Sequence, residues 1–225
     1  MKLTQIKTIA PVAVTFLCFT FFVTNTLGAV VLQPTAASTG MGELFPASHT
    51  RDQSGLSIGY TSGVTDFDTY ITSGPTAFHD FGDSVWSPPS GVRSGNFDFA
   101  LGGTYLVSAM AFWNAIGDPS SVRQFSLLLD DNASFSSPDN VGTFTASNSL
   151  GTGQNTAAEV FNFADTSASF VRLQILNTWS DSSFSTVFNE AAFRVSAVPE
   201  PTTSALFCVG IAAFLLRRGR GKRCD

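Results

Sequence analysis

The chain has 225 residues, which is enough for one domain of ordinary size with targeting segments at its ends. Hydrophobic residues make up 44% of the chain, which excludes a disordered protein, whereas charged residues make up only 13%. Phenylalanine occurs 22 times and glycine 19 times while lysine and glutamate are scarce, so the composition favours an all-β domain over a helical one.

Charge divides the chain into an acidic middle and two basic ends. Between Val30 and Val198 there are five arginines and no lysine against fifteen aspartates and glutamates, a formal charge of −10. Such a region repels phosphate backbones, so no nucleic acid is expected as a partner. The other seven basic residues flank apolar runs at the two ends, as they do in segments that enter membranes.

Residues 1–29 have the three-part layout of a secretory signal peptide. Lys2 and Lys7 precede an apolar stretch over residues 9–23, and small residues follow at 26–29. This order predicts a signal-peptide helix that is removed near residue 29, and therefore export. A permanent membrane anchor is the alternative, and a lipoprotein cleavage site is a weaker one.

The run Gly55-Leu56-Ser57-Ile58-Gly59 has the spacing of the nucleophile elbow of α/β-hydrolases. That elbow needs a buried strand before the serine and a helix after it, but both flanks are polar here. We therefore expect Ser57 to lie in a turn between two β segments. His49 and His79 have no second histidine at ligand spacing, so we expect loop or surface positions and no zinc site.

Acidic pairs follow this run. A strand over residues 65–71 would place Asp66 and Asp68 on one face, and Asp80 and Asp83 bracket an expected turn. Two nearby carboxylates can hydrolyse glycosidic bonds. Such pairs also arise easily in a domain this acidic, so we do not expect an enzyme.

Seven short runs with apolar residues at period two are bounded by Gly, Pro, Asn and Asp, which predicts strands. They cover residues 96–99, 105–113, 122–129, 141–145, 160–163, 170–176 and 189–195. In the last run Phe193 and Val195 are expected to point inward, and Glu190 and Arg194 outward. Seven short strands indicate an antiparallel β-sandwich over residues 30–198. This region has no cysteine, so disulfides do not stabilise it.

Two kinds of site are expected on the sandwich. Sugar rings are held by aromatic faces and planar polar groups, and Trp86 and Trp179 are the tryptophans outside the periodic runs. They are the predicted ligand contacts, whereas Trp113 lies within an apolar run and is expected in the core. Asp130, Asp131 and Asn132 offer oxygen ligands for calcium, although the same residues commonly turn a chain after a strand.

The order of the strands resembles the discoidin-like, galactose-binding-like jelly roll. The matching segments are Asn96–Tyr105, Ala111–Asn114, Phe125–Asp131, Phe170–Ile175 and Asn189–Phe193. The resemblance covers about 100 residues and leaves residues 30–94 largely unmatched. It implies binding of glycans or other surface ligands through loops at one end of the sandwich, with a structural calcium ion in some members.

Residues 199–225 form a second targeting segment. Pro199-Glu200-Pro201 precedes an apolar run over 205–216, and Arg217 and Arg218 open a basic cluster. Twelve apolar residues are fewer than the roughly 20 that span a bilayer, so a terminal core helix is the alternative. A core helix would not be flanked by Pro-Glu-Pro on one side and five basic residues on the other, so a short transmembrane helix with a cytoplasmic basic tail is expected.

These three parts resemble the PEP-CTERM sorting signal of bacterial proteins that an exosortase processes. The resemblance implies export, transient membrane retention, removal of the tail near Pro-Glu-Pro, and delivery to the cell surface or an exopolysaccharide matrix. The chain is thus interpreted as a non-catalytic exported protein that binds extracellular polysaccharide, neutral polymers above all because of the −10 charge. A purely structural matrix component and a glycan hydrolase are the alternatives.

Overall fold

A computed structural model describes residues 28–80, 82–115, 120–148, 151–152, 155–179 and 185–198. Residues 1–27 of the predicted signal peptide and the whole predicted sorting tail, 199–225, lie outside these ranges. Within them, no helix has the length and apolar character needed to cross a bilayer.

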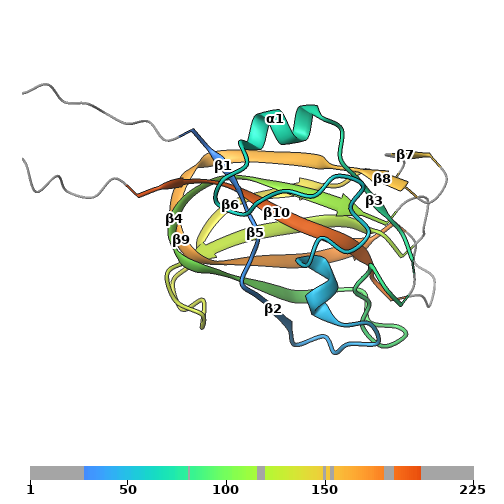
Figure 1. Ribbon diagram of the computed structural model, residues 1–225. Helices are drawn as coiled ribbons and strands as arrows, with labels where there is room; N and C mark the ends of the chain where they lie inside the picture. Colours follow the sequence, from blue (N-terminus) through green and yellow to red (C-terminus); the bar gives the residue numbers. More distant parts are fainter. Residues whose placement is uncertain are drawn as a thin grey trace, which may run out of the picture.

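The described residues form an antiparallel β-sandwich, which confirms the predicted fold class (Figure 1). Seven strands join in one hydrogen-bonded sheet, in the order β1-β10-β4-β9-β5-β6 with β2 beside β4. Their bounds are Val30–Leu32 (β1), Ala36–Thr39 (β2), Gly95–Asn114 (β4), Val122–Asp130 (β5), Asp139–Thr145 (β6), Glu159–Thr178 (β9) and Phe188–Ala197 (β10). A smaller sheet contains Thr76–Phe78 (β3), Gly151–Thr152 (β7) and Asn155–Ala157 (β8).

The two layers of the sandwich arise because β4 and β9 bend and take part in both. The first part of β4 pairs with β2, and its second part, from Tyr105 on, pairs with β10. Between them the register against β9 shifts from Ala100↔Phe170 to Tyr105↔Ala168. Gly102 lies in this corner with φ +81°, a conformation that glycine adopts without strain.

The bends correct the prediction of seven separate short strands. The runs at 96–99 and 105–113 both belong to β4, and those at 160–163 and 170–176 both belong to β9. Glycine and small polar residues at 102–104 were expected to end a strand, but strands also turn corners of a sandwich at such residues without ending.

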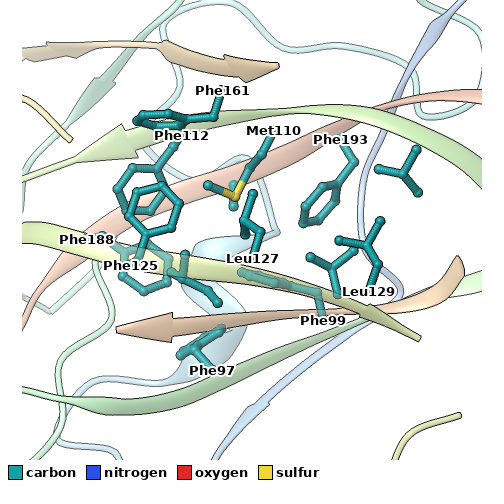
Figure 2. Close-up of a cluster of buried hydrophobic side chains, with 14 of the residues drawn as sticks. Phe97, Phe99, Met110, Phe112, Phe125, Leu127, Leu129, Phe161, Phe188 and Phe193 are labelled. Carbon is teal, nitrogen blue, oxygen red and sulfur yellow. The ribbon is translucent and has the colours of Figure 1, made fainter. Parts of the chain in front are cut away.

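The hydrophobic core lies between the layers and is rich in phenylalanine (Figure 2). Phe97 and Phe99 from the first part of β4 are fully buried, as are Phe112 from its second part and Phe125 from β5. Neighbouring rings meet edge-on or tilted, for example Phe125 and Phe161 with centroids 5.0 Å apart. Such ring contacts contribute stabilisation in addition to that gained from burying apolar surface. The inward positions predicted for Phe193 and Val195 are confirmed.

A second layer of packing covers the outer face of β10 and β4. It includes the helix α1, Phe67–Thr72, which lies above the sandwich in Figure 1. Phe67 and Tyr70 pack there with Trp113 and Ala192. Glu190 was predicted to point outward, and an outward side chain was expected to be exposed to solvent. The covering segment instead buries it, so the Glu190 side chain is 0% exposed.

One local prediction in residues 47–80 is also wrong. The predicted strand over 65–71 is helix α1, because the Asp66 carboxylate accepts a hydrogen bond of 2.8 Å from the Thr69 N–H and caps the first turn. His79 lies in the loop after β3, one of the two positions expected for it, but it is buried, with its Nδ1 3.2 Å from Asn189 Oδ1. His49 lies half-buried in a 3-10 helix, Ala47–Thr50, with its Nδ1 3.1 Å from the Val85 carbonyl oxygen.

Candidate functional site

The candidate site lies at the end of the sandwich where β9 ends and β5 and β10 begin. The backbone N–H of Trp179 donates to the Ser121 carbonyl at 3.1 Å, and Ser121 forms a parallel bridge with Val187, just before β10. On the other side the N–H of Thr186 donates to the Val92 carbonyl at 2.9 Å. Three segments far apart in the sequence, near residues 92, 121 and 179, thus meet at one end.

Bulges in two strands shape this end. Val122 pairs with Thr178, Gln124 with Asn177, and Phe125 with Ile175, so β5 has an extra residue at Arg123 and β9 has one at Leu176. A bulge turns the side chain of the extra residue away from the regular alternation. Leu176 is accordingly 40% exposed, although it lies between buried Ile175 and the end of the strand.

The indole ring of Trp179 is fixed and partly exposed. Its Nε1–H donates to the Ala146 carbonyl at 3.0 Å, and the Arg123 guanidinium carbon lies 5.0 Å from the ring centroid. That distance is within the range of a cation–π contact. Trp179 keeps 38% of its surface exposed, so solvent reaches the ring while the hydrogen bond and the arginine hold its orientation.

A surface pocket of about 250 Å³ is lined in part by the three residues that directly precede Trp179 in the sequence. Its lining combines an arginine, an amide, two hydroxyls and one leucine: Gly91, Arg93, Ser94, Leu176, Asn177 and Thr178. Asn177 Nδ2 also donates to Gln124 Oε1 at 3.3 Å, which holds both amides in place. The end of the sandwich therefore presents an aromatic ring and planar polar groups on neighbouring strand ends.

This combination suits a polar ring-shaped ligand. The aromatic ring can stack on the C–H groups of such a ring, and amide and guanidinium groups can hydrogen-bond to its hydroxyls. Asn177 lies in the last residues of β9 and Gln124 in the first residues of β5, so these amides are held in place before a ligand arrives.

The structure separates the two tryptophans that the sequence grouped together. Trp86 is 0% exposed, and its ring lies 4.7 Å from Phe97 and 5.4 Å from Phe188, centroid to centroid. A ring without exposed surface cannot stack on a ligand, so the predicted ligand contact at Trp86 is wrong and the residue belongs to the core. Trp113 is buried as predicted, with its Nε1–H donating to the Pro75 carbonyl at 3.1 Å.

Asp130, Asp131 and Asn132 form the turn after β5. The two carboxylate oxygens of Asp130 accept hydrogen bonds from the N–H groups of Asn132 at 3.0 Å and Ser137 at 3.3 Å. Burial opposes ionisation, but these backbone hydrogen bonds, together with hydrogen bonds from the side chain and backbone of Asp131, lower the pKa of Asp130. In the described ranges no three His, Cys, Asp or Glu side chains gather as metal ligands. Calcium at this turn stays a prediction.

The residues of the disfavoured hydrolase interpretation have structural roles. Ser57 Oγ accepts hydrogen bonds from the N–H and hydroxyl of Thr76 at 2.9 and 3.0 Å, beside the bridge between Leu56 and Ala77. Asp66 caps α1, and Asp68 pairs with Arg194 at 2.9 Å. The expected turn between two β segments is found only in part: Ser57 lies in a bend directly after the bridged Leu56, but the next element along the chain is helix α1.

Sequence reasoning missed Arg93, Arg123, Leu176 and Asn177. Asn177-Thr178-Trp179 was a usable signal, because it is a polar and aromatic run directly after a buried strand. Arg123 carried no such signal. Its place over Trp179 depends on a bulge and on the pairing of β5 with β9, which are 29 residues apart at their nearest ends.

Fold and site together define the chain as an antiparallel β-sandwich with an aromatic and polar site at one end. Residues 197–220 match the family described as the PEP-CTERM protein-sorting motif, which indicates a secreted, surface-sorted protein. This stretch includes Pro199, Glu200, Pro201, Arg217 and Arg218 of the predicted sorting signal, all outside the described residues. No curated protein matches the chain.

Several solved carbohydrate-binding modules are similar in structure. The CBM32 of AlyQ in complex with 4,5-unsaturated mannuronic acid is 18% identical, with 73% of this chain and 97% of that chain covered and a TM-score of 0.46. Chitosan-binding module 1 of a chitosanase/glucanase from Paenibacillus sp. IK-5 is 16% identical, with 74% and 96% covered and a TM-score of 0.44. Truncated AlyQ with CBM32 and alginate lyase domains is 18% identical, with a TM-score of 0.48. There, 77% of this chain is covered, and the chain spans 35% of that longer protein.

Proposed function

We propose that this protein is a non-catalytic, exported surface or matrix protein that binds extracellular polysaccharide at the Trp179 end of its sandwich. The observation that carries the proposal is the exposed and fixed Trp179 ring, which directly follows the residues Leu176, Asn177 and Thr178 that line a polar pocket. The ring supplies the stacking face, and Asn177 and Gln124 supply amides for sugar hydroxyls.

The charge of the domain favours neutral polymers as ligands. With a formal charge of −10 over residues 30–198, the surface repels a long anionic chain unless divalent cations bridge the two. Stacking and neutral hydrogen bonds are screened by salt far less than ion pairs are. Binding to neutral glycans is therefore expected to be weak and nearly independent of monovalent salt.

Binding of purified protein to neutral oligosaccharides by isothermal titration tests the site. Trp179→Ala should reduce affinity at least tenfold and leave the fold intact. Phe78→Ala is the matched control, because Phe78 is an aromatic of similar exposure, 40%, on β3 in the smaller sheet. Equal losses in both variants, or none in either, would contradict a site at Trp179. Absence of saturable binding by the wild type would favour a structural matrix component, and turnover of the glycan would favour a hydrolase.

We also propose that the sorting segment holds the exported precursor at the membrane until an exosortase-type protease removes it near Pro199 to Pro201. The mature form should then start near Val30 and end near Pro199 to Pro201. Mass spectrometry of the extracellular protein checks both ends. Replacing Glu200 should leave an unprocessed, membrane-held precursor, whereas extracellular protein that retains residues 205–216 would contradict the proposal.

A further inference from the structure

Both ends of the described domain lie at the same end of the sandwich. Val30, the first residue of β1, pairs with Val195 near the end of β10. Ala197, the last residue of β10, pairs with Tyr105 beside the bend of β4. Figure 1 shows β1 beginning and β10 ending on the same side of the molecule. We call this the tether end, defined by residues 28–30, 63–66, 102–105 and 195–198.

The candidate site lies at the opposite end of the same strands. Trp179 is hydrogen-bonded to Ser121, which bridges Val187 at the start of β10, whereas the tether end is where β10 finishes. β10 has ten residues, so about 33 Å of extended strand separates the two ends.

The matched sorting motif begins at the tether end itself. Its match begins at residue 197, which is the last residue of β10. From Val198 to the apolar run that begins at Ala205 there are seven residues, which reach at most about 25 Å when fully extended. A membrane that holds the apolar run therefore lies closer to the tether end than the length of the sandwich.

We infer that the membrane-held precursor stands with its tether end toward the lipid surface and its Trp179 end toward the outside. This inference rests on the membrane retention in the proposed function and not on glycan binding. In this orientation the site is open to external polymer before the tail is removed. The signal peptide, attached next to Val30, would hold the same end during export, so both attachments leave the opposite end free.

The covalent attachment to the membrane segment sets the orientation of the domain, and binding of the domain surface to lipid does not. Residues 30–198 contain no lysine and have a formal charge of −10, so the domain as a whole is not attracted to anionic headgroups. The exposed side chains at the tether end include Val64, Val198 and the carboxylate of Asp66, so this end carries no positive charge toward the lipid.

Fluorescence quenching by lipid tests the inference on the full chain. Its three cysteines, Cys18, Cys208 and Cys224, all lie outside residues 30–198 and are replaced by serine. A single fluorophore is then attached through Val64→Cys or Val198→Cys at the tether end, or through Ser94→Cys or Leu176→Cys at the site end. Each protein is reconstituted in phosphatidylcholine vesicles with a nitroxide-labelled headgroup lipid, and vesicles without nitroxide are the control.

The expected result is quenching several-fold stronger at positions 64 and 198 than at positions 94 and 176. Equal quenching at all four positions, or stronger quenching at the site end, would overturn the inference. Failure of the protein to float with the vesicles would overturn it too, because the membrane tether would be missing. No glycan is present, so this outcome is independent of whether the Trp179 site binds sugar.

Discussion

The carboxylate of Glu190 accepts a hydrogen bond of 3.3 Å from the backbone N–H of Gln53, although the two residues lie 137 positions apart. Glu190 is 0% exposed, and its second oxygen, Oε1, has no hydrogen-bond partner. Burial raises the pKa of Glu190 well above its usual range, and the Asp52 carboxylate adds to the increase. The Gln53 N–H and the Arg51 guanidinium lower the pKa, but by less.

We predict that Glu190→Gln flattens the pH dependence of stability. In the unfolded chain Glu190 ionises above about pH 4.3, while the folded protein keeps it protonated until its raised pKa is reached. Within this window the folded state binds more protons, so wild-type stability falls by up to about 1.4 kcal/mol per pH unit as pH rises. The variant lacks this loss and should be the more stable protein at neutral pH, as measured by urea unfolding.

Glu43→Gln is the control for this experiment, because Glu43 is exposed. It should change stability by less than about 0.5 kcal/mol at every pH. A Glu190→Gln variant whose stability parallels that of the wild type from pH 4 to 8 would show that the buried carboxyl is ionised or hydrated in solution.

The two tryptophans should differ sharply in their effect on stability. Trp86→Ala removes a fully buried ring and should cost about 3–5 kcal/mol. Trp179→Ala removes a partly exposed ring and one hydrogen bond, so a loss of about 1 kcal/mol is expected. Chemical denaturation of both variants measures the difference, and similar losses would contradict the separation of core from surface.

Gly102 should tolerate no side chain at the bend of β4. Its φ is +81°, and a Cβ there would lie 2.5 Å from Thr35 Cγ2. Gly102→Ala should therefore cost about 1–3 kcal/mol. Gly40→Ala is the control, since no atom lies within 4 Å of the added Cβ and the backbone needs no positive φ. Equal melting temperatures for the two variants would show that the bend adapts.

Calcium at residues 130–132 is tested by scanning calorimetry. Saturating calcium should raise the melting temperature, as a ligand of the native state does, and a chelator should reverse the rise. Asp131→Asn should abolish the effect without breaking the turn, because Asp130 holds the turn through backbone hydrogen bonds. Asp139→Asn, at the exposed start of β6, is the matched control. If neither calcium nor a chelator changes the melting temperature, residues 130–132 only turn the chain and bind no calcium.

The strands were predictable because their signal is local. Alternation over the predicted strand 122–129 brings Phe125, Leu127 and Leu129 to one face of β5 whatever the rest of the chain does, and all three are buried. The sorting motif is likewise local, since Pro199-Glu200-Pro201, the apolar run and the arginines follow one another directly.

The limits of the strands and the residues of the site depend on contacts between segments that are far apart in the sequence, so a local sequence pattern could not predict them. Whether the chain ends a strand or bends at Gly102 is decided by the partners β2, β9 and β10, because the same glycine permits both. Arg123 reaches Trp179 because β5 bulges against β9. A bulge changes the direction of one side chain, but the pattern of apolar and polar residues in the sequence around it does not reveal it.

By itself, the sequence determined the all-β class, the inward faces of the strands and the sorting segment. Only the tertiary structure decided that Trp86 is core and Trp179 is surface, and that the outward residue Glu190 is buried. The physical reason is that alternation assigns a side chain to one of two faces of a sheet, whereas burial depends on what covers that face. Here the cover comes from residues 53–70, more than 100 positions before the strand that they shield.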